Sequence, residues 1–139
     1  KPYDGPRCMK CGKSVAPQEE FCSECSGRKR FFTEGKGIYF YDDRMKGSLL
    51  RYKYYGRREY GDFYAAAMCR YGKKEIERWQ VDLLIPVPLH PSKQRRRGFN
   101  QAQYLADRIG AFYGIPVSGS ALIKKVKCRG TLQKPSGCF

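Results

Sequence analysis

The sequence predicts an α/β protein, a parallel sheet with flanking helices, preceded by a small four-cysteine module. An apolar run at 81–85 suits a buried strand, and the apolar stripe that follows at 99–113 has the spacing of a helix. Near the N-terminus, four cysteines form a Cys-x2-Cys, x10, Cys-x2-Cys pattern. We therefore expect the four-cysteine module at 1–35 and an α/β domain at 36–139 that is incomplete at its C-terminus.

The four cysteines are spaced as two knuckles that can bind one metal ion. Four thiolates so arranged suit tetrahedral Zn²⁺, and the ligands are Cys8, Cys11, Cys22 and Cys25. Residues 1–30 contain few apolar side chains, so a structural zinc would supply on the order of 10 kcal/mol of folding free energy. The alternative is a pair of disulfides in a secreted module. The other cysteines, Cys69, Cys128 and Cys138, lack ligand spacing and are assigned no role.

The middle of the chain alternates short predicted elements. Residues 37–41 are β-rich and predict a strand, 44–55 predict a helix, and the apolar spacing from Tyr60 predicts a second helix ending near Trp79. Four tyrosines here are interleaved with basic residues: Tyr52, Tyr54, Tyr55 and Tyr60. They either stack on single-stranded bases or pack on the core, and the sequence leaves both interpretations open.

A dense basic loop separates the 81–85 strand from the following helix. Pro86 and Pro88 end the strand, while Gly114 and Pro116 end the helix. Free amides at the start of that helix, surrounded by cations, predict an anion site. Its predicted residues are Lys93, Arg95, Arg96, Arg97, Gly98, Phe99 and Asn100. Residues 121–123 then predict another strand.

The net charge of +15 is concentrated toward the C-terminal end, where residues 81–139 contain ten Lys and Arg against two acids. Such a field attracts nucleotides, pyrophosphate and nucleic-acid backbones alike. The sequence contains no run of about 20 apolar residues and no signal peptide, which excludes a membrane-spanning protein and predicts a cytoplasmic one.

The string Pro-Val-Pro-Leu-His-Pro, the spaced arginines and Gly-Phe-Asn-Gln resemble the ComF family of phosphoribosyltransferase-like proteins. The resemblance implies a type I phosphoribosyltransferase fold, with Arg97-Gly98-Phe99 at the pyrophosphate of phosphoribosyl pyrophosphate. It also implies a flap, for which Lys125 and Lys127 are candidates. The family's acidic pair and Thr-Thr-Gly loop are absent from the sequence. We therefore expect no turnover from this chain alone, and Mg²⁺ with phosphoribosyl pyrophosphate only in a complete family member.

The resemblance implies a role in DNA uptake, and the basic loop predicts binding of a phosphorylated small molecule; the catalytic residues are unknown. The alternatives are a non-enzymatic module that binds single-stranded nucleic acid and an adaptor that docks proteins of the uptake machinery. An exposed sheet edge near 121–126 also predicts self-association.

Overall fold

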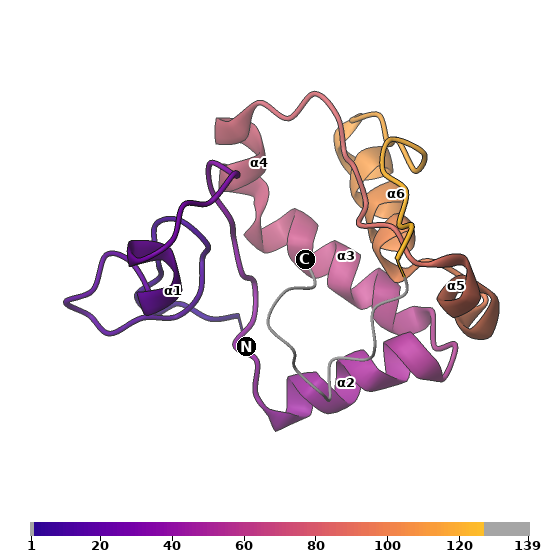
Figure 1. The fold of residues 1–139 in the computed structure, drawn as a ribbon, viewed down its shortest axis with the longest axis horizontal. Coiled ribbons are helices and arrows are strands. Elements are labelled where there is room, and N and C mark those ends of the chain that lie inside the picture. The colour runs from indigo at the N-terminus through magenta and orange to yellow at the C-terminus, as the bar shows by residue number, and fades with distance from the viewer. Residues whose placement is uncertain (1, 127–139) are drawn as a thin grey trace.

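The computed structural model describes residues 2–126, and within them the chain is helical. Figure 1 shows the N-terminal residues to one side of a group of longer helices. In chain order the helices are α1 (Ser23–Ser26), α2 (Asp43–Tyr54), α3 (Glu59–Tyr71), α4 (Lys73–Trp79), α5 (Pro91–Arg97) and α6 (Gln101–Tyr113).

The predicted parallel sheet is wrong for the residues described. They contain no extended strand and only two isolated bridges, Arg7 with Ser14 and Leu84 with Val117. The 81–85 segment makes a single parallel pairing, in which the Leu84 amide donates to the Pro116 carbonyl at 2.9 Å and the Ser118 amide donates to the Leu84 carbonyl at 3.0 Å. A strand needs a partner along its length, and here the pairing ends after one residue.

The other two predicted strands are also absent. Residues 37–41 form irregular chain with a bend at Tyr39, and residues 121–123 form a bend and irregular chain. The helices were predicted more accurately, because their hydrogen bonds are local. The helix expected at 44–55 is α2, whereas the one expected from Tyr60 to Trp79 is divided at Gly72 into α3 and α4.

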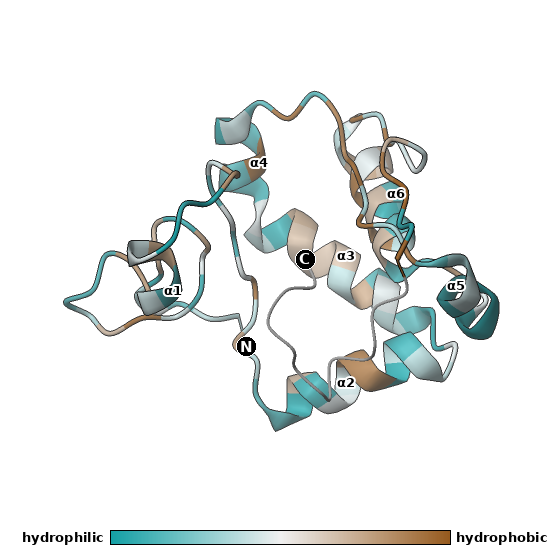
Figure 2. Ribbon diagram, in the orientation of Figure 1, coloured by the Kyte–Doolittle hydropathy of each residue, from teal (hydrophilic) through white to brown (hydrophobic). Residues whose placement is uncertain are grey.

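The core lies where α3 packs against α6 and α2. Tyr52, Tyr64, Ala67 and Ile109 are among its buried side chains. At Gly61 of α3, an added Cβ would lie 2.7 Å from the Tyr104 ring and 2.9 Å from the Tyr52 ring, so glycine allows these helices to approach closely. Figure 2 shows the apolar 83–89 segment running beside α6, while α5 is strongly hydrophilic. None of the helices within 2–126 combines the length and apolar character needed to cross a bilayer.

Candidate metal centre and basic site

The four predicted ligands converge in the N-terminal module. The sulfur atoms of Cys8, Cys11, Cys22 and Cys25 all lie within 4.8 Å of one another. A tetrahedral zinc site with bonds of about 2.3 Å requires sulfur pairs about 3.8 Å apart, and the Cys11 and Cys22 sulfurs are 3.7 Å apart. The quartet therefore fits a single metal ion with four thiolate ligands.

Local backbone geometry brings the two knuckles together. In the first, the Cys8 amide donates to the Lys13 carbonyl and the Gly12 amide donates to the Cys8 carbonyl. Gly12 has φ +71°, a left-handed conformation that glycine adopts without strain. In the second, α1 begins directly after Cys22, whose carbonyl accepts the amides of Cys25 and Ser26.

The thiols of the quartet are electrostatically unequal. Burial alone would raise the pKa of Cys8, but backbone amides of Cys11, Cys22 and Lys10 outweigh burial and lower it to about 6. Burial and the neighbouring sulfurs raise the pKa of Cys25 to about 12, and burial also raises the pKa of Cys11. A metal bound by four thiolates would therefore compete with protons for Cys11 and Cys25.

The segment 34–38 connects the module to α4. Its Gly35 carbonyl would be 2.5 Å from a Cβ on Gly12, so the first knuckle lies directly against this segment. On the other side, Glu34 accepts from Arg78 at 2.5 Å and from the Trp79 indole at 3.0 Å, and Lys36 pairs with Glu75. Segment 34–38 thus contacts both the first cysteine knuckle and α4.

The predicted basic loop is largely the short helix α5, which the sequence analysis missed. His90 is its N-cap and Pro91 occupies the first turn, two signals that were available in the sequence. Gly98 ends α5 at φ 78°, and its amide donates to the Gln94 carbonyl at 2.8 Å. The expectation that the Gly98 amide is free for an anion is therefore wrong, since it closes this turn. Asn100 caps α6 through the Ala102 amide.

Arg97 is held by Tyr54, for which the sequence predicted either base stacking or core packing, and by Gln101, which was not among the predicted site residues. Its Nη1 donates to Gln101 Oε1 at 3.0 Å, and its Nη2 donates to the Tyr54 hydroxyl at 3.2 Å. The guanidinium carbon also lies 4.7 Å from the centroid of the Tyr54 ring. Arg97 Nε and Gln101 Nε2 are buried without a hydrogen-bond partner among the described residues. Gln101 follows Asn100 in the Gly-Phe-Asn-Gln string, so a sequence signal existed.

The other predicted anion-site residues lie around this arginine. Arg96 is exposed, with its guanidinium 5.9 Å from the Tyr54 ring, and Arg95 is also exposed. Lys93 is half-buried on the same helix. Phe99 packs against Tyr52 and carries the Arg58 guanidinium at 5.0 Å. We call this group the α5–α6 basic site: Lys93, Arg95, Arg96, Arg97, Gly98, Phe99 and Asn100.

The tyrosines expected either to stack on bases or to pack on the core differ in burial. Tyr52 is 2% exposed and donates to the Gln101 carbonyl at 2.9 Å, and burial raises the pKa of its hydroxyl. Tyr54 and Tyr55 are 50% and 74% exposed. Of the flap candidates, Lys125 is exposed in irregular chain remote in sequence from α5, and Lys127 lies outside the described residues.

The described residues define a helical protein with a four-cysteine cluster able to hold one metal ion and an arginine-rich surface in the same fold. Comparison with curated proteins identifies the family to which the chain belongs. The chain belongs to the ComF family of competence proteins. No protein-family model and no solved structure matches it.

Three relatives support this assignment. The chain is 31% identical over 118 residues to competence protein ComFC of Bacillus subtilis, covering 77% of this chain and 46% of the relative. It is 25% identical over 125 residues to competence protein F of Haemophilus influenzae, covering 88% and 54%. It is 26% identical over 117 residues to ComFC of Streptococcus pneumoniae, covering 78% and 46%. The chain spans about half the length of these relatives.

Proposed function

We propose that this chain acts in natural competence, in the uptake or processing of transforming DNA, and that it binds a phosphorylated ligand at the α5–α6 basic site. The names of its relatives support the competence role. The arrangement around Arg97 supports the ligand class. We further propose that the four-cysteine module at 1–35 is a separate domain whose metal is structural zinc.

The observation that supports the ligand proposal is that contacts within the protein already fix the guanidinium of Arg97. Tyr54 and Gln101 fix its guanidinium from two sides. A planar, fixed guanidinium donates paired hydrogen bonds to phosphate oxygens at a lower entropic cost than a mobile one. Arg95 and Arg96 precede it in the last turn of α5. Like charges this close favour a polyanion such as pyrophosphate or the phosphates of a nucleotide.

Calorimetric titration of pyrophosphate into wild-type and variant chains tests this proposal. We expect Arg97→Ala to weaken binding by about 1–3 kcal/mol, because charge-assisted hydrogen bonds are lost. Arg97→Lys should recover only part of the loss, because lysine keeps the charge without the planar fork. The matched control is Arg70→Ala, which removes an exposed arginine on α3. Equal losses from Arg97→Ala and Arg70→Ala would contradict an organised site.

A second candidate function is the binding of single-stranded nucleic acid by the same surface. The observation favouring it is that exposed Tyr54 and Tyr55 lie at the end of α2, close in sequence to Arg57 and Arg58. Aromatic rings stack on bases of any sequence while arginines contact phosphates. Under this alternative, affinity for labelled oligonucleotides rises with their length and falls steeply with salt. A ligand site of the first kind saturates at one pyrophosphate per chain.

A further inference from the structure

A shallow apolar groove lies between α3 and α6, away from the α5–α6 basic site. Its volume is about 620 Å³. Ala66, Phe112 and Tyr113 contribute to its apolar surface, and Phe112 is 69% exposed. An aromatic ring this exposed beside a concave surface gains hydrophobic free energy when another surface covers it. The groove has the character of a docking surface.

The rim of this groove is basic. Arg70, Lys73 and Arg108 line it, with Asp62 as its acidic member. Arg108 is paired with Asp62 at 3.0 Å, and Lys73 makes only an exposed 3.7 Å contact with Glu77. Arg70 forms no ion pair with a carboxylate among residues 2–126. The rim therefore favours an occupant that carries negative charge beside an apolar side chain.

The chain itself carries such an element at the edge of the four-cysteine module. Glu19, Glu20 and Phe21 are consecutive and exposed, with 44% of Phe21 accessible. Neither glutamate forms an ion pair within the described part of the chain. Met9 is 64% exposed, and its amide donates to the Glu20 carbonyl, which places a second apolar residue at the same edge. We call Glu19, Glu20 and Phe21 the acidic tip.

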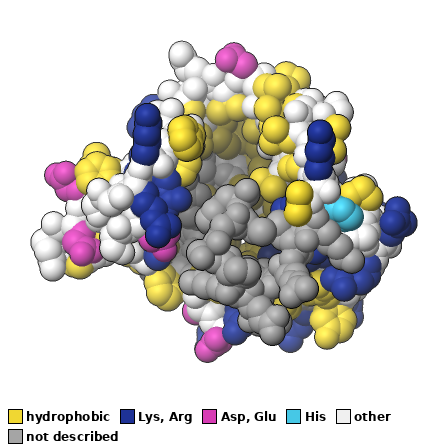
Figure 3. Space-filling view, in the orientation of Figure 1, with side chains coloured by type: hydrophobic (Ala, Val, Ile, Leu, Met, Phe, Trp, Pro, Cys, Tyr) yellow, Lys and Arg dark blue, Asp and Glu magenta, His cyan; other side chains and the backbone are white. Residues whose placement is uncertain are grey.

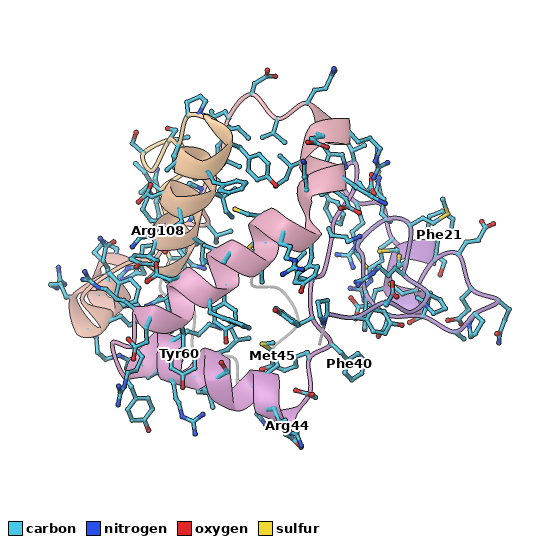
Figure 4. All side chains as sticks on the ribbon, turned by 180° about the vertical axis from the view of Figure 1, so that it is seen from behind. Phe21, Phe40, Arg44, Met45, Tyr60 and Arg108 are labelled. Carbon is cyan, nitrogen blue, oxygen red and sulfur yellow. The ribbon has the colours of Figure 1, made fainter. Side chains whose placement is uncertain are left out.

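The acidic tip and the groove lie on different sides of one molecule. Figure 4 labels Phe21 on the module and Arg108 on α6, at the opposite side of the protein. Figure 3 shows acidic and hydrophobic side chains together at the outer edge of the module. With this separation, a rigid chain cannot place its own tip in its own groove. The acidic tip can therefore meet this groove only in a second molecule.

We propose that the acidic tip of one copy docks in the α3–α6 groove of a second copy, with Phe21 against Phe112 and the two glutamates facing Arg70 and Lys73. The contact is heterologous, because the two surfaces differ, so it repeats from copy to copy into a ring or an open chain. This inference is independent of the phosphate-binding proposal, since it uses none of the residues of the α5–α6 basic site.

Sedimentation velocity over a range of protein concentration tests the contact with two complementary variants. Glu19→Arg with Glu20→Arg reverses the tip and leaves the groove intact. Ala66→Arg fills the groove and leaves the tip intact, and it adds a positive charge that would strengthen any diffuse attraction to acidic residues. The matched control is Ala111→Arg, which makes the same change at an exposed position of α6 outside the groove.

We expect the wild-type chain and Ala111→Arg to show a mass that increases with concentration. Each blocking variant alone should associate at least about tenfold more weakly. Mixed together, the two variants should form a 1:1 complex and nothing larger, because only one tip and one groove remain functional. This restored complex also shows that both variants are folded.

Three results would overturn the proposal. The first is a wild-type chain that stays monomeric at every concentration. The second is association of both blocking variants at wild-type strength, which would place the contact elsewhere, for example near 121–126. The third is failure of the mixture to form a complex, which would exclude pairing of tip and groove.

Discussion

At the scale of single residues, the basic site depends on how its arginines are held. Arg95 and Arg96 are exposed, whereas Arg97 is half-buried and tied to Tyr54 and Gln101. Long cationic side chains lose considerable conformational entropy when they are fixed on binding. An arginine already fixed in the free protein avoids much of that loss. We therefore assign Tyr54 as a positioning residue for Arg97.

Replacing Tyr54 by alanine should weaken pyrophosphate binding through its effect on Arg97. We expect a loss of about 0.5–1.5 kcal/mol, because both the hydrogen bond and the stacked ring are removed. Tyr55→Ala is the matched control, since Tyr55 is the more exposed neighbour. In the Arg97→Ala background, Tyr54→Ala should have almost no further effect in calorimetry. Additive losses would show that Tyr54 acts independently of Arg97.

At the scale of elements, short turns decide how the module meets the helices. The first knuckle closes at Gly12, which is both left-handed in conformation and in contact with Gly35 and Gly37. The segment 34–38 continues from this contact to α4 through Glu34 and Lys36. None of these contacts is periodic in sequence, so hydrophobic patterns cannot reveal them.

Gly12→Ala and Gly47→Ala should change stability in opposite directions. At Gly12 the added methyl would meet backbone at 2.5 Å in a left-handed conformation, so we expect destabilisation of more than about 1–2 kcal/mol. At Gly47, within α2, no atom lies within 4 Å of the added Cβ. There we expect stabilisation of about 0.5–1 kcal/mol from helix propensity. Urea unfolding monitored by circular dichroism measures the effect of Gly47→Ala. The protease sensitivity of residues 1–35 over a urea series measures that of Gly12→Ala, and a neutral Gly12→Ala would contradict the close packing described.

The contacts between segment 34–38 and α4 should make stability depend on acid pH. Hydrogen bonds from Arg78 and Trp79 lower the pKa of Glu34, and the hydrogen bond from Lys36 lowers the pKa of Glu75. A carboxyl whose pKa is lower in the folded state contributes stability above its unfolded pKa, which is lost as pH falls through the folded value.

The double variant Glu34→Gln with Glu75→Gln tests this contribution. Between pH 7 and about pH 3 it should lose less stability on acidification than the wild type does, because the two groups no longer titrate. At neutral pH the variant should be the less stable of the two. Urea midpoints at a series of pH values measure the difference. Parallel curves for the two proteins would show that these ion pairs contribute nothing to folding.

At the scale of the whole molecule, the four-cysteine module and the helical part differ in the contacts that stabilise them. The buried side chains of the helical part include Tyr52, Tyr64 and Ile109. Those of the module include two of the four clustered cysteines, Cys8 and Cys22, while Phe31 is 97% exposed. Because the module buries few apolar groups, we expect its folding to depend on metal binding by the four cysteines.

We predict one Zn²⁺ per chain, held by the four clustered cysteines. Elemental analysis of the purified protein should find it, and Cys11→Ser should remove it while Cys69→Ser should not, since Cys69 is buried in α3. Stripping the metal with a chelator should leave the far-ultraviolet signal of α2, α3 and α6 largely intact and make residues 1–35 sensitive to protease. A metal-free protein with four oxidised thiols in this module would contradict the prediction.

The structural features that depend on local spacing could be predicted from the sequence alone. The pairs Cys8 with Cys11 and Cys22 with Cys25 fix a metal-ligand pattern, and the periodic stripes fix α2 and α6 to within two residues of their predicted starts. Both patterns repeat within a short stretch of the chain. They can therefore be recognised in the sequence without knowledge of contacts to distant residues. The helix α5 is equally local, and its start at Pro91 is also marked in the sequence.

The features that need partners distant in sequence could be recognised only in the tertiary structure. Whether an apolar run becomes a strand depends on a neighbour, and the 81–85 segment pairs at Leu84 alone. Tyr54 and Arg97 are 43 residues apart in sequence, yet they form the best-defined part of the basic site. In the sequence, no pattern marks the residues of the acidic tip or of the groove. The fold exposes these two surfaces on opposite sides of the molecule. Long-range contacts have no period along the chain, and this is why the arrangement of the site was visible only in three dimensions.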